Sequence, residues 1–403
     1  MVVRDYAKCN VCGTKLILRA GIGLEKLCLH SFDCPHCHSP LTVAARTGEP
    51  PEAWLEPGEN ISRIEDEDTT AVCINLHPSC AFSLKDFHDP RTFASLVYMN
   101  VIGRFMRVPS GSKSASAVTE FEVPNTGALW QVVASVLSLA MKRDPAGVLG
   151  TQIKSYTDAR RETLPGFMCS TPFKCVASFF DDIFYPAFGD LRSPIKALIS
   201  QQTAAHPAEI ARFKAYYLSD LERPNVERYL ATFNDYFRNF DTFRQMLAYT
   251  RVGSQTVDDL VVGSKLFDEI KLYYGQAYEA LTSSFVTLGA LFNIGSGRPF
   301  DQFASMSLSK YVNDVEKAKR SAPFKGVPEL TAFTLFEDSS LRNGSHHASI
   351  WRDGEIVRYR SGGTGAERDI SYSRYLHMCN GITIALAALF VIELQFFSKL
   401  ATS

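Results

Sequence analysis

The sequence lacks three features that would place it in a specialised class of protein. No apolar run reaches the roughly 20 residues that a membrane-spanning helix needs; the longest, ITIALAALFVI at 382–392, is expected to form a buried helix. The 403 residues carry a formal net charge of only −1, which excludes a strongly basic nucleic-acid coat protein. No segment repeats with a period of about 20–50 residues, which excludes a solenoid.

Cysteine is sparse as well, and its distribution along the chain is uneven. Ten cysteines in 403 residues are too few for a disulfide-rich scaffold, yet five of them lie within the first 37 residues. The sequence starts MVVRDYAKCNVC, which has no apolar segment of the kind that a secretory signal requires. A cysteine cluster without such a signal indicates a metal site in a reducing compartment, so we expect a cytoplasmic protein that does not bind membranes.

Four of the clustered cysteines form two pairs with the same spacing. Cys9 and Cys12 occur in CNVCG, and Cys34 and Cys37 occur in CPHCH. Two such pairs, each on a tight turn, supply the four thiolates of a tetrahedral zinc site, and the pattern resembles a zinc ribbon. Four thiolates leave no open position for water, so the zinc is expected to be structural and to help fold a module of residues 1–45.

Several other cysteines and histidines are weaker candidates for metal ligands. Potential substitutes within the ribbon are Cys28, His30, His36 and His38. A second group, irregular in spacing, consists of Cys73, His77 and Cys80. The remaining cysteines are interpreted as packing residues: Cys169, Cys175 and Cys379.

Composition and periodicity divide the rest of the chain in two. Residues 46–124 start with an acidic segment that contains prolines and include PSGSKSASA at 109–117, so they are interpreted as a linker and unassigned mixed region with a mobile loop. Apolar residues at three- and four-residue steps then predict an α-helical domain over 125–403. The predicted helical segments are 125–143, 206–218, 225–249, 265–292 and 371–400. The predicted fold class is therefore mainly α: a helical bundle with a small β-hairpin insertion and an N-terminal β zinc ribbon.

A polar stretch, SLRNGSHHAS, interrupts the apolar pattern of the helical domain. It places Arg342 and Asn343 shortly before the adjacent His346 and His347. Histidine can act as a general acid or base near neutral pH, and the donor fork of arginine suits phosphate oxygens and the charge that builds up in a transition state. Cleavage of RNA without a metal ion requires these two kinds of side chain.

This stretch resembles the signature of the HEPN superfamily, in which an arginine and a polar neighbour precede a histidine at the edge of a helical bundle. The following ASIWRDGEIVRYRS, with a turn at Asp353-Gly354, is similar to a β-hairpin found in several relatives. The resemblance covers about residues 200–403. It implies a metal-independent endoribonuclease that cleaves RNA at a composite site in a homodimer, as part of a bacterial toxin or anti-phage defence system.

Other interpretations of the same residues stay open. A step of five residues turns an ideal helix by about 140°, so Arg342 and His347 share a face only if Gly344 marks an irregular turn. His347 fits the spacing of the signature best, with four residues between it and Arg342, whereas His346 has only three; the two histidines compete for the catalytic role. Alternatively, Arg342 and Asn343 cap helix ends and the histidines lie in a surface turn. HEPN relatives include non-catalytic members, so the chain could be a dimeric sensor or scaffold, or a zinc-ribbon protein that binds nucleic acid.

Charged residues around the stretch bear on its substrate. Arg358 and Arg360 should share one face of a strand, and Lys325 precedes the stretch. Such a basic surface would hold an RNA backbone through its phosphates, although nearby acidic residues also allow an ordinary solvated surface. Glu337 and Asp338, just upstream, either orient the histidine or lie exposed at a helix end. The ribbon is expected to recognise a protein or nucleic-acid partner.

Overall fold

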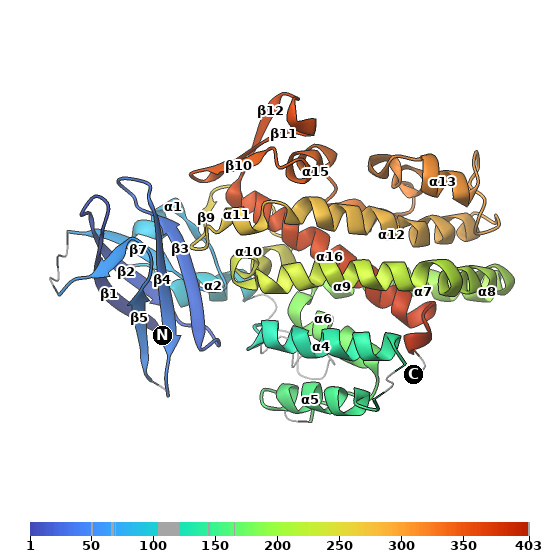
Figure 1. Cartoon of the computed structure of the whole chain (residues 1–403), viewed down its shortest axis with the longest axis horizontal. Coiled ribbons are helices and arrows are strands. Elements are labelled where there is room, and N and C mark those ends of the chain that lie inside the picture. The colour runs from blue at the N-terminus through green and yellow to red at the C-terminus, as the bar shows by residue number, and fades with distance from the viewer. Residues whose placement is uncertain are drawn as a thin grey trace. The chain divides into compact units, whose positions relative to one another are not determined.

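The computed structural model describes residues 1–49, 51–65, 68, 70–103, 121–143, 146–164 and 166–401. The chain folds as two compact units, each built from three separate segments (Figure 1). Unit 1 consists of Met1–Asn125, Asn239–Leu272 and Asn343–Asn380, and unit 2 consists of Thr126–Arg238, Tyr273–Arg342 and Gly381–Ser403. Each unit thus combines distant parts of the sequence, whereas the predicted regions 1–45, 46–124 and 125–403 were continuous. The loop expected at 109–117 lies outside the described residues.

The fold is mixed α/β, so the prediction of a mainly α helical bundle is wrong. The chain is 54% helical and 17% strand, and its described strands form several small sheets. Four strands lie in the region that was interpreted as a linker: β5 (Ala53–Pro57), β6 (Ile61–Arg63), β7 (Val72–Leu76) and β8 (Phe82–Ser83). Segments this short show no clear alternation, and their strand conformation comes from pairing with distant partners.

Two sheets of unit 1 carry the cysteine pairs. Their further strands are β1 (Val2–Cys9), β2 (Lys15–Gly21), β3 (Leu27–Asp33) and β4 (Pro40–Thr47). One sheet has the order β6-β1-β2-β7, and the other has the order β3-β4-β5. The hairpins β1–β2 and β3–β4 are antiparallel, and each closes around one cysteine pair. By contrast, β7 runs parallel to β2, with Leu16 opposite Val72.

The hairpin predicted after the histidines is present in unit 1. It consists of β10 (Ile350–Asp353) and β11 (Ile356–Arg360), and Gly354 in its turn has a φ of 59°, which glycine adopts without strain. A third strand, β12 (Glu367–Ser371), was not predicted and pairs with β11. Further described elements of unit 1 include β9 (Leu260–Val261), which pairs with β8, and the helices α1 (Leu84–His88), α2 (Ala94–Ile102), α10 (Phe240–Arg251) and α11 (Phe267–Ile270).

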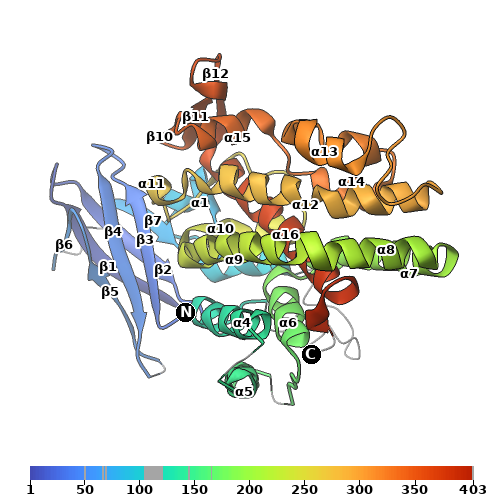
Figure 2. The same ribbon diagram turned by 45° about the vertical axis from the view of Figure 1, so that its right-hand side comes forward.

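Unit 2 is built from helices. Those described include α4 (Thr126–Met141), α5 (Leu149–Arg161), α6 (Pro172–Phe184), α7 (Ala187–Ala205), α8 (Pro207–Tyr216), the π-helix η1 (Tyr217–Leu221), α9 (Glu222–Arg238), α12 (Tyr273–Gly295), α13 (Leu308–Asp314) and α14 (Pro328–Thr331). The helices α7 and α8 lie side by side (Figure 2). Two helices, α15 (Ser339–His346) and α16 (Tyr372–Phe396), contribute residues to both units. The helix predicted at 225–249 is divided at Asn239 into α9 and α10.

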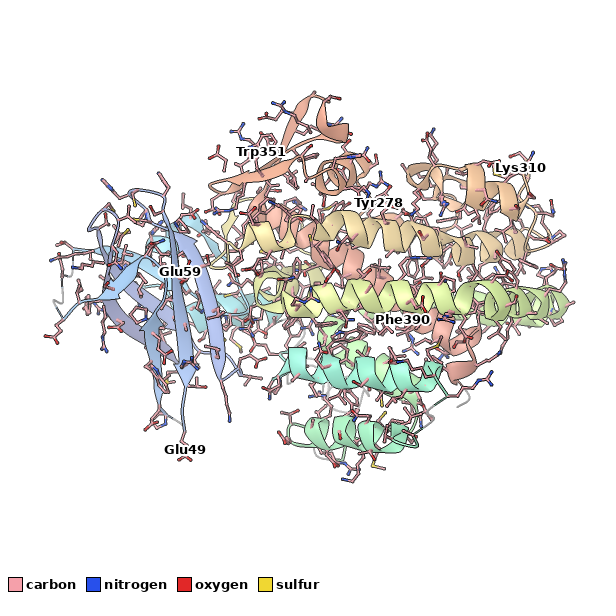
Figure 3. The ribbon with its side chains drawn as sticks, in the orientation of Figure 1. Glu49, Glu59, Tyr278, Lys310, Trp351 and Phe390 are labelled. Carbon is pink, nitrogen blue, oxygen red and sulfur yellow. The ribbon has the colours of Figure 1, made fainter. Side chains whose placement is uncertain are left out.

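Aromatic side chains fill the core of unit 2. The Trp130 ring stacks on Phe237 with 5.0 Å between centroids, and its Nε1 donates to Asn234 at 2.8 Å. Phe390 of α16 belongs to the same aromatic core and contacts Tyr229 with 4.7 Å between centroids (Figure 3). Aromatic rings in offset or tilted contact stabilise a core by more than the burial of their apolar surface alone.

The helix α16 is the one described helix that is long and apolar enough to cross a membrane. However, 94% of its most apolar window is buried within the fold, and the expected burial of this segment is thus confirmed. Its Glu393 is fully buried and accepts hydrogen bonds from Tyr217 at 3.2 Å, Asn225 and Thr287. Burial raises the pKa of Glu393 to about 7 against the opposing effect of these donors.

The core of unit 1 contains two buried histidines. His30 and His77 are 1% and 3% exposed. Burial, followed by the positive charge of Arg244, lowers the pKa of each imidazole to about 3. Both rings are therefore neutral in the folded chain at physiological pH.

Acid should destabilise unit 1 through His30. The unfolded histidine binds a proton below about pH 6.5, whereas the folded one does so only near pH 3, so stability is lost as the pH falls through this window. Between pH 6.5 and 5 the loss should be about 1.6 kcal/mol for this residue. Urea unfolding at both pH values measures it.

A pair of variants provides the control for this experiment. His30→Leu should reduce the pH dependence, whereas His206→Leu, at a partly exposed position in unit 2, should leave it unchanged. Identical pH dependence in all three proteins would contradict the assignment to His30.

Candidate functional site

The first cysteine pair lies on a tight turn between β1 and β2. The backbone N–H of Cys9 donates to the Thr14 carbonyl, and that of Gly13 donates back to the Cys9 carbonyl, both at 2.9 Å. Gly13 has a φ of 76°, which explains why glycine follows Cys12. The Thr14 hydroxyl lies 3.1 Å from the Cys12 sulfur.

The second pair repeats this turn between β3 and β4. The N–H of Cys34 donates to the Ser39 carbonyl at 2.9 Å, and that of His38 donates to the Cys34 carbonyl at 3.0 Å. His38 takes the place of the glycine, with a φ of 59°, and the Ser39 hydroxyl lies 3.4 Å from the Cys37 sulfur. The two turns thus present their sulfur atoms in equivalent ways.

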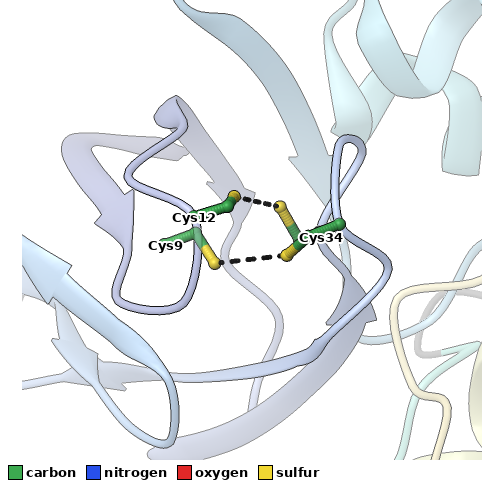
Figure 4. A group of neighbouring side chains, drawn as sticks. Cys9, Cys12 and Cys34 are labelled. Carbon is green, nitrogen blue, oxygen red and sulfur yellow. Dashed lines mark hydrogen bonds between the residues drawn. The ribbon is translucent and has the colours of Figure 1, made fainter.

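All four predicted ligands come together. The sulfur atoms of Cys9, Cys12, Cys34 and Cys37 lie within 4.8 Å of one another. The Cys9 and Cys37 sulfurs are 3.8 Å apart, and those of Cys12 and Cys34 are 3.7 Å apart, so the two turns face each other across the cluster (Figure 4). This cluster could hold a metal ion.

Local hydrogen bonds prepare two of the thiols for metal binding. The hydroxyl and backbone of Thr14 lower the pKa of Cys12, and those of Ser39 lower the pKa of Cys37 to about 6. Burial instead raises the pKa of Cys34 to about 12. Because a metal binds thiolates, its positive charge would have to offset this desolvation at Cys34.

The other candidate ligands do not join a cluster. Among the described residues, no second group of cysteine, histidine or carboxylate side chains lies close enough to share an ion. The Cys28 sulfur accepts a hydrogen bond from Arg244 at 2.8 Å, and Cys80 contacts the Ala94 carbonyl at 3.8 Å. Within the residues that the structure describes, Cys73, His77 and Cys80 therefore do not form a metal site.

An ion network joins the second cysteine turn to the β10–β11 hairpin. Asp33, directly before Cys34, accepts hydrogen bonds from both terminal nitrogens of Arg352, at 2.8 and 3.0 Å. Lys265, whose side chain is 5% exposed, bridges Asp33 and Glu355. Burial alone would raise the pKa of Asp33, but these two cations lower it below its usual value. The network is neutral overall and fixes the turn against the hairpin.

The predicted catalytic arginine lies in α15 and has a carboxylate partner within unit 2. The Nε of Arg342 donates to Glu279 Oε1 at 2.5 Å, and its Nη2 donates to the same oxygen. Lys317 binds the other oxygen of Glu279. These donors lower the pKa of Glu279 although burial opposes them. The sequence did not single out Glu279, because 63 residues separate it from its partner.

The residues of the stretch that follow Arg342 belong to unit 1. Asn343 donates from Nδ2 to the Ser361 hydroxyl at 3.3 Å. His346 and His347 are both exposed, and their rings meet edge to face with 5.8 Å between centroids. The helix α15 ends at His346, and the N–H of His347 still donates to the Asn343 carbonyl at 3.1 Å.

Gly344 does not interrupt the helix, contrary to the irregular turn that was considered. A Cβ atom at this position would lie 2.8 Å from the Tyr359 Cβ, so the glycine allows β11 to pack against α15. In a regular helix His346 lies about 40° from Arg342 around the axis, and His347 lies about 140° from it. The helix therefore puts His346, rather than His347, on the arginine's side.

Asp338, and not Arg342 or Asn343, caps the start of α15. Asp338 Oδ1 accepts from the N–H groups of Ser340 and Leu341, at 2.8 and 2.9 Å. Arg342 and Asn343 lie inside the helix. Burial raises the pKa of Glu337 to about 7, against a hydrogen bond from Ser321 and the charge of Lys325.

The basic residues expected to hold a substrate are partly neutralised. Arg358 and Arg360 lie on the same face of β11, as predicted, but both bind Glu367, at 3.0 and 3.2 Å. Lys325 is exposed and belongs to unit 2. Trp351, on the adjacent strand β10, lies with its ring 5.9 Å from the Arg360 guanidinium carbon (Figure 3).

Comparison of the chain with family models, curated proteins and solved structures found no match.

Removal of a cluster cysteine should abolish metal binding. The purified chain should contain about one metal ion, and Cys9→Ala or Cys34→Ala should lose it, because three thiolates hold an ion far less tightly than four. Elemental analysis by mass spectrometry gives the content. Cys73→Ala, at a buried position outside the cluster, should retain the ion. Full metal content in both ligand variants would show that the ion is bound elsewhere.

Proposed function

We propose that the chain is a metal-independent endoribonuclease whose cysteine cluster holds a structural zinc ion. Tetrahedral zinc with bonds of about 2.3 Å to sulfur requires sulfur atoms about 3.8 Å apart. The separations of 3.7 and 3.8 Å in the cluster support zinc. Because four thiolates fill its coordination sphere, the ion would stabilise unit 1 and take no part in RNA cleavage.

The observation that carries the proposal is the placement of Arg342 and His346 four residues apart along α15. Glu279 orients the guanidinium, whose side chain is 26% exposed, and one helical turn later the imidazole is exposed. The rise over four residues is about 6 Å, so one phosphodiester group could contact both side chains. His347, the residue after His346, would serve as the second candidate for proton transfer.

The proposed reaction uses the 2′-hydroxyl of RNA as the nucleophile. One histidine removes its proton while the oxygen attacks the phosphorus, and a second histidine protonates the departing 5′-oxygen. Arg342 would stabilise the negative charge that develops on the phosphate oxygens. The products would be a 2′,3′-cyclic phosphate and a free 5′-hydroxyl.

A homodimer would supply the second acid–base group. If His346 is the catalytic histidine of each chain, two copies of α15 facing one another bring two histidines and two arginines to one substrate. Such a site is what the HEPN resemblance implies, together with a role in bacterial toxin or anti-phage systems. Cytoplasmic localisation, and a protein or nucleic-acid partner for the ribbon, belong to the same proposal.

The neutralised arginines favour a second candidate, a non-catalytic dimeric sensor or scaffold. Glu367 occupies both Arg358 and Arg360, and Glu279 occupies Arg342. A surface whose cations already have acidic partners attracts an RNA backbone less strongly. In this case the stretch would stabilise α15 without acting on RNA.

Substitutions in α15 distinguish the two candidates. The full chain should cleave single-stranded RNA in EDTA and leave cyclic phosphate ends. His346→Ala should lower kcat/KM by about 10²–10⁴-fold, the usual contribution of a general acid or base, and His347→Ala should have a smaller effect. Arg342→Lys keeps the charge but loses the fork, so it should also be impaired.

Matched controls are His206→Ala and Arg238→Ala, at positions remote from α15 in the sequence. Arg238 forms an ion pair with Asp235 and its side chain is 71% exposed. Circular dichroism of each variant would verify folding. If wild type and all α15 variants bind RNA equally without cutting it, the endoribonuclease proposal is wrong and the scaffold candidate is favoured.

A further inference from the structure

Two cysteines interpreted from the sequence as packing residues lie in contact within unit 2. The sulfur atoms of Cys169 and Cys175 are 2.6 Å apart. Non-bonded heavy atoms normally approach to about 3.5–4.0 Å, and bonded sulfurs lie about 2.05 Å apart. The pair therefore lies much nearer to bonding distance than packing alone explains, and little movement would join the two atoms.

The chain around the pair brings the sulfurs together at the start of α6. Thr171 is the N-cap residue of this helix, and its side chain accepts from the Lys174 N–H at 3.2 Å. Its carbonyl accepts from the Cys175 N–H at 3.1 Å and lies 3.6 Å from the Cys169 sulfur. The capping turn thus fixes both cysteines on one side of Thr171.

The two thiols differ in exposure and in the direction of their pKa shifts. Cys175 is fully buried, whereas Cys169 is 9% exposed and follows Met168, which is 72% exposed. The hydrogen bond with Cys175 lowers the pKa of Cys169, and the backbone of Thr171 and the charge of Lys174 add to the effect. The same contact, together with burial, raises the pKa of Cys175. Cys169 is therefore the thiol that a reagent in solution meets first.

We propose that Cys169 and Cys175 form a redox-active dithiol that a low-molecular-weight disulfide, such as oxidised glutathione, converts into an intramolecular disulfide. The Cys169 thiolate attacks one sulfur of glutathione disulfide and releases one glutathione thiolate. Cys175 then loses its proton, attacks the Cys169 sulfur and releases the second glutathione. Two cysteine thiols are oxidised and one glutathione disulfide is reduced to two thiols. This site is independent of the proposed ribonuclease.

A disulfide between Cys169 and Cys175 would link the residues just before α6 covalently to the first turn of α6, next to the contacts between α5 and α6. The Thr157 hydroxyl of α5 donates to the Cys169 carbonyl at 3.3 Å. Arg160 of α5 and Asp182 of α6 form a buried ion pair of 2.9 Å. A covalent bond at Cys169 would join these contacts to the first turn of α6, so oxidation should stabilise unit 2.

Mass spectrometry of the full, metal-loaded chain tests the proposal. After reduction and removal of the reductant, oxidised glutathione should decrease the intact mass by about 2 Da, the two hydrogens lost on forming the disulfide. Peptides mapped after alkylation should show Cys169 linked to Cys175. Oxidised wild type should also unfold a few degrees above the reduced form, and a reductant should reverse the shift.

Single substitutions identify the roles of the two thiols. Cys175→Ala should accumulate a glutathione adduct on Cys169, because no second thiol releases it, whereas Cys169→Ala should form no adduct at the buried Cys175. Cys379→Ala, at another fully buried position, should cross-link like wild type. If Cys169 and Cys175 are both alkylated after oxidation of folded wild type, the proposal is wrong. An adduct on Cys175 in Cys169→Ala would also overturn the assigned order of attack.

Discussion

The ion pair between Asp33 and Arg352 is the interaction on which the organisation of unit 1 depends. It joins the residue before a cluster cysteine to a hairpin more than three hundred positions later in the chain. Lys265 and Glu355 complete a network in which two cations and two carboxylates neutralise one another. The side chains of Asp33, Arg352 and Lys265 are largely buried, whereas that of Glu355 is 38% exposed. A charge-neutral network of this kind tolerates burial, whereas any one of its members alone would be costly to bury.

The sequence predicted best those parts of the fold whose signal is local. The cysteine turns and the hairpin at Asp353-Gly354 depend on a few adjacent residues, and the structure contains them. The strands β6 and β7 were missed because three to five residues carry too little pattern, and because distant strands determine their conformation. The division at Asn239 was missed for a related reason: an apolar stripe continued across it, although α9 and α10 pack in different units.

The candidate site shows the same limit at the level of side chains. Sequence reasoning found Arg342 and the two histidines because they are neighbours, but not Glu279, which lies on another helix. The role of Gly344 was also misjudged: glycine suggested a break in the helix, whereas its missing side chain makes room for Tyr359. Only tertiary contacts distinguish a glycine that bends a backbone from one that admits a neighbour.

The parallel pairing of β2 with β7 has a consequence for the order in which the sheet assembles. The β1–β2 hairpin has local contacts and can close as soon as its turn forms, while β7 must be synthesised before it can join the same sheet. Until then the open edge of β2 is exposed to unwanted strand pairing. The nascent chain is thus vulnerable to aggregation during the interval in which residues between these two strands leave the ribosome.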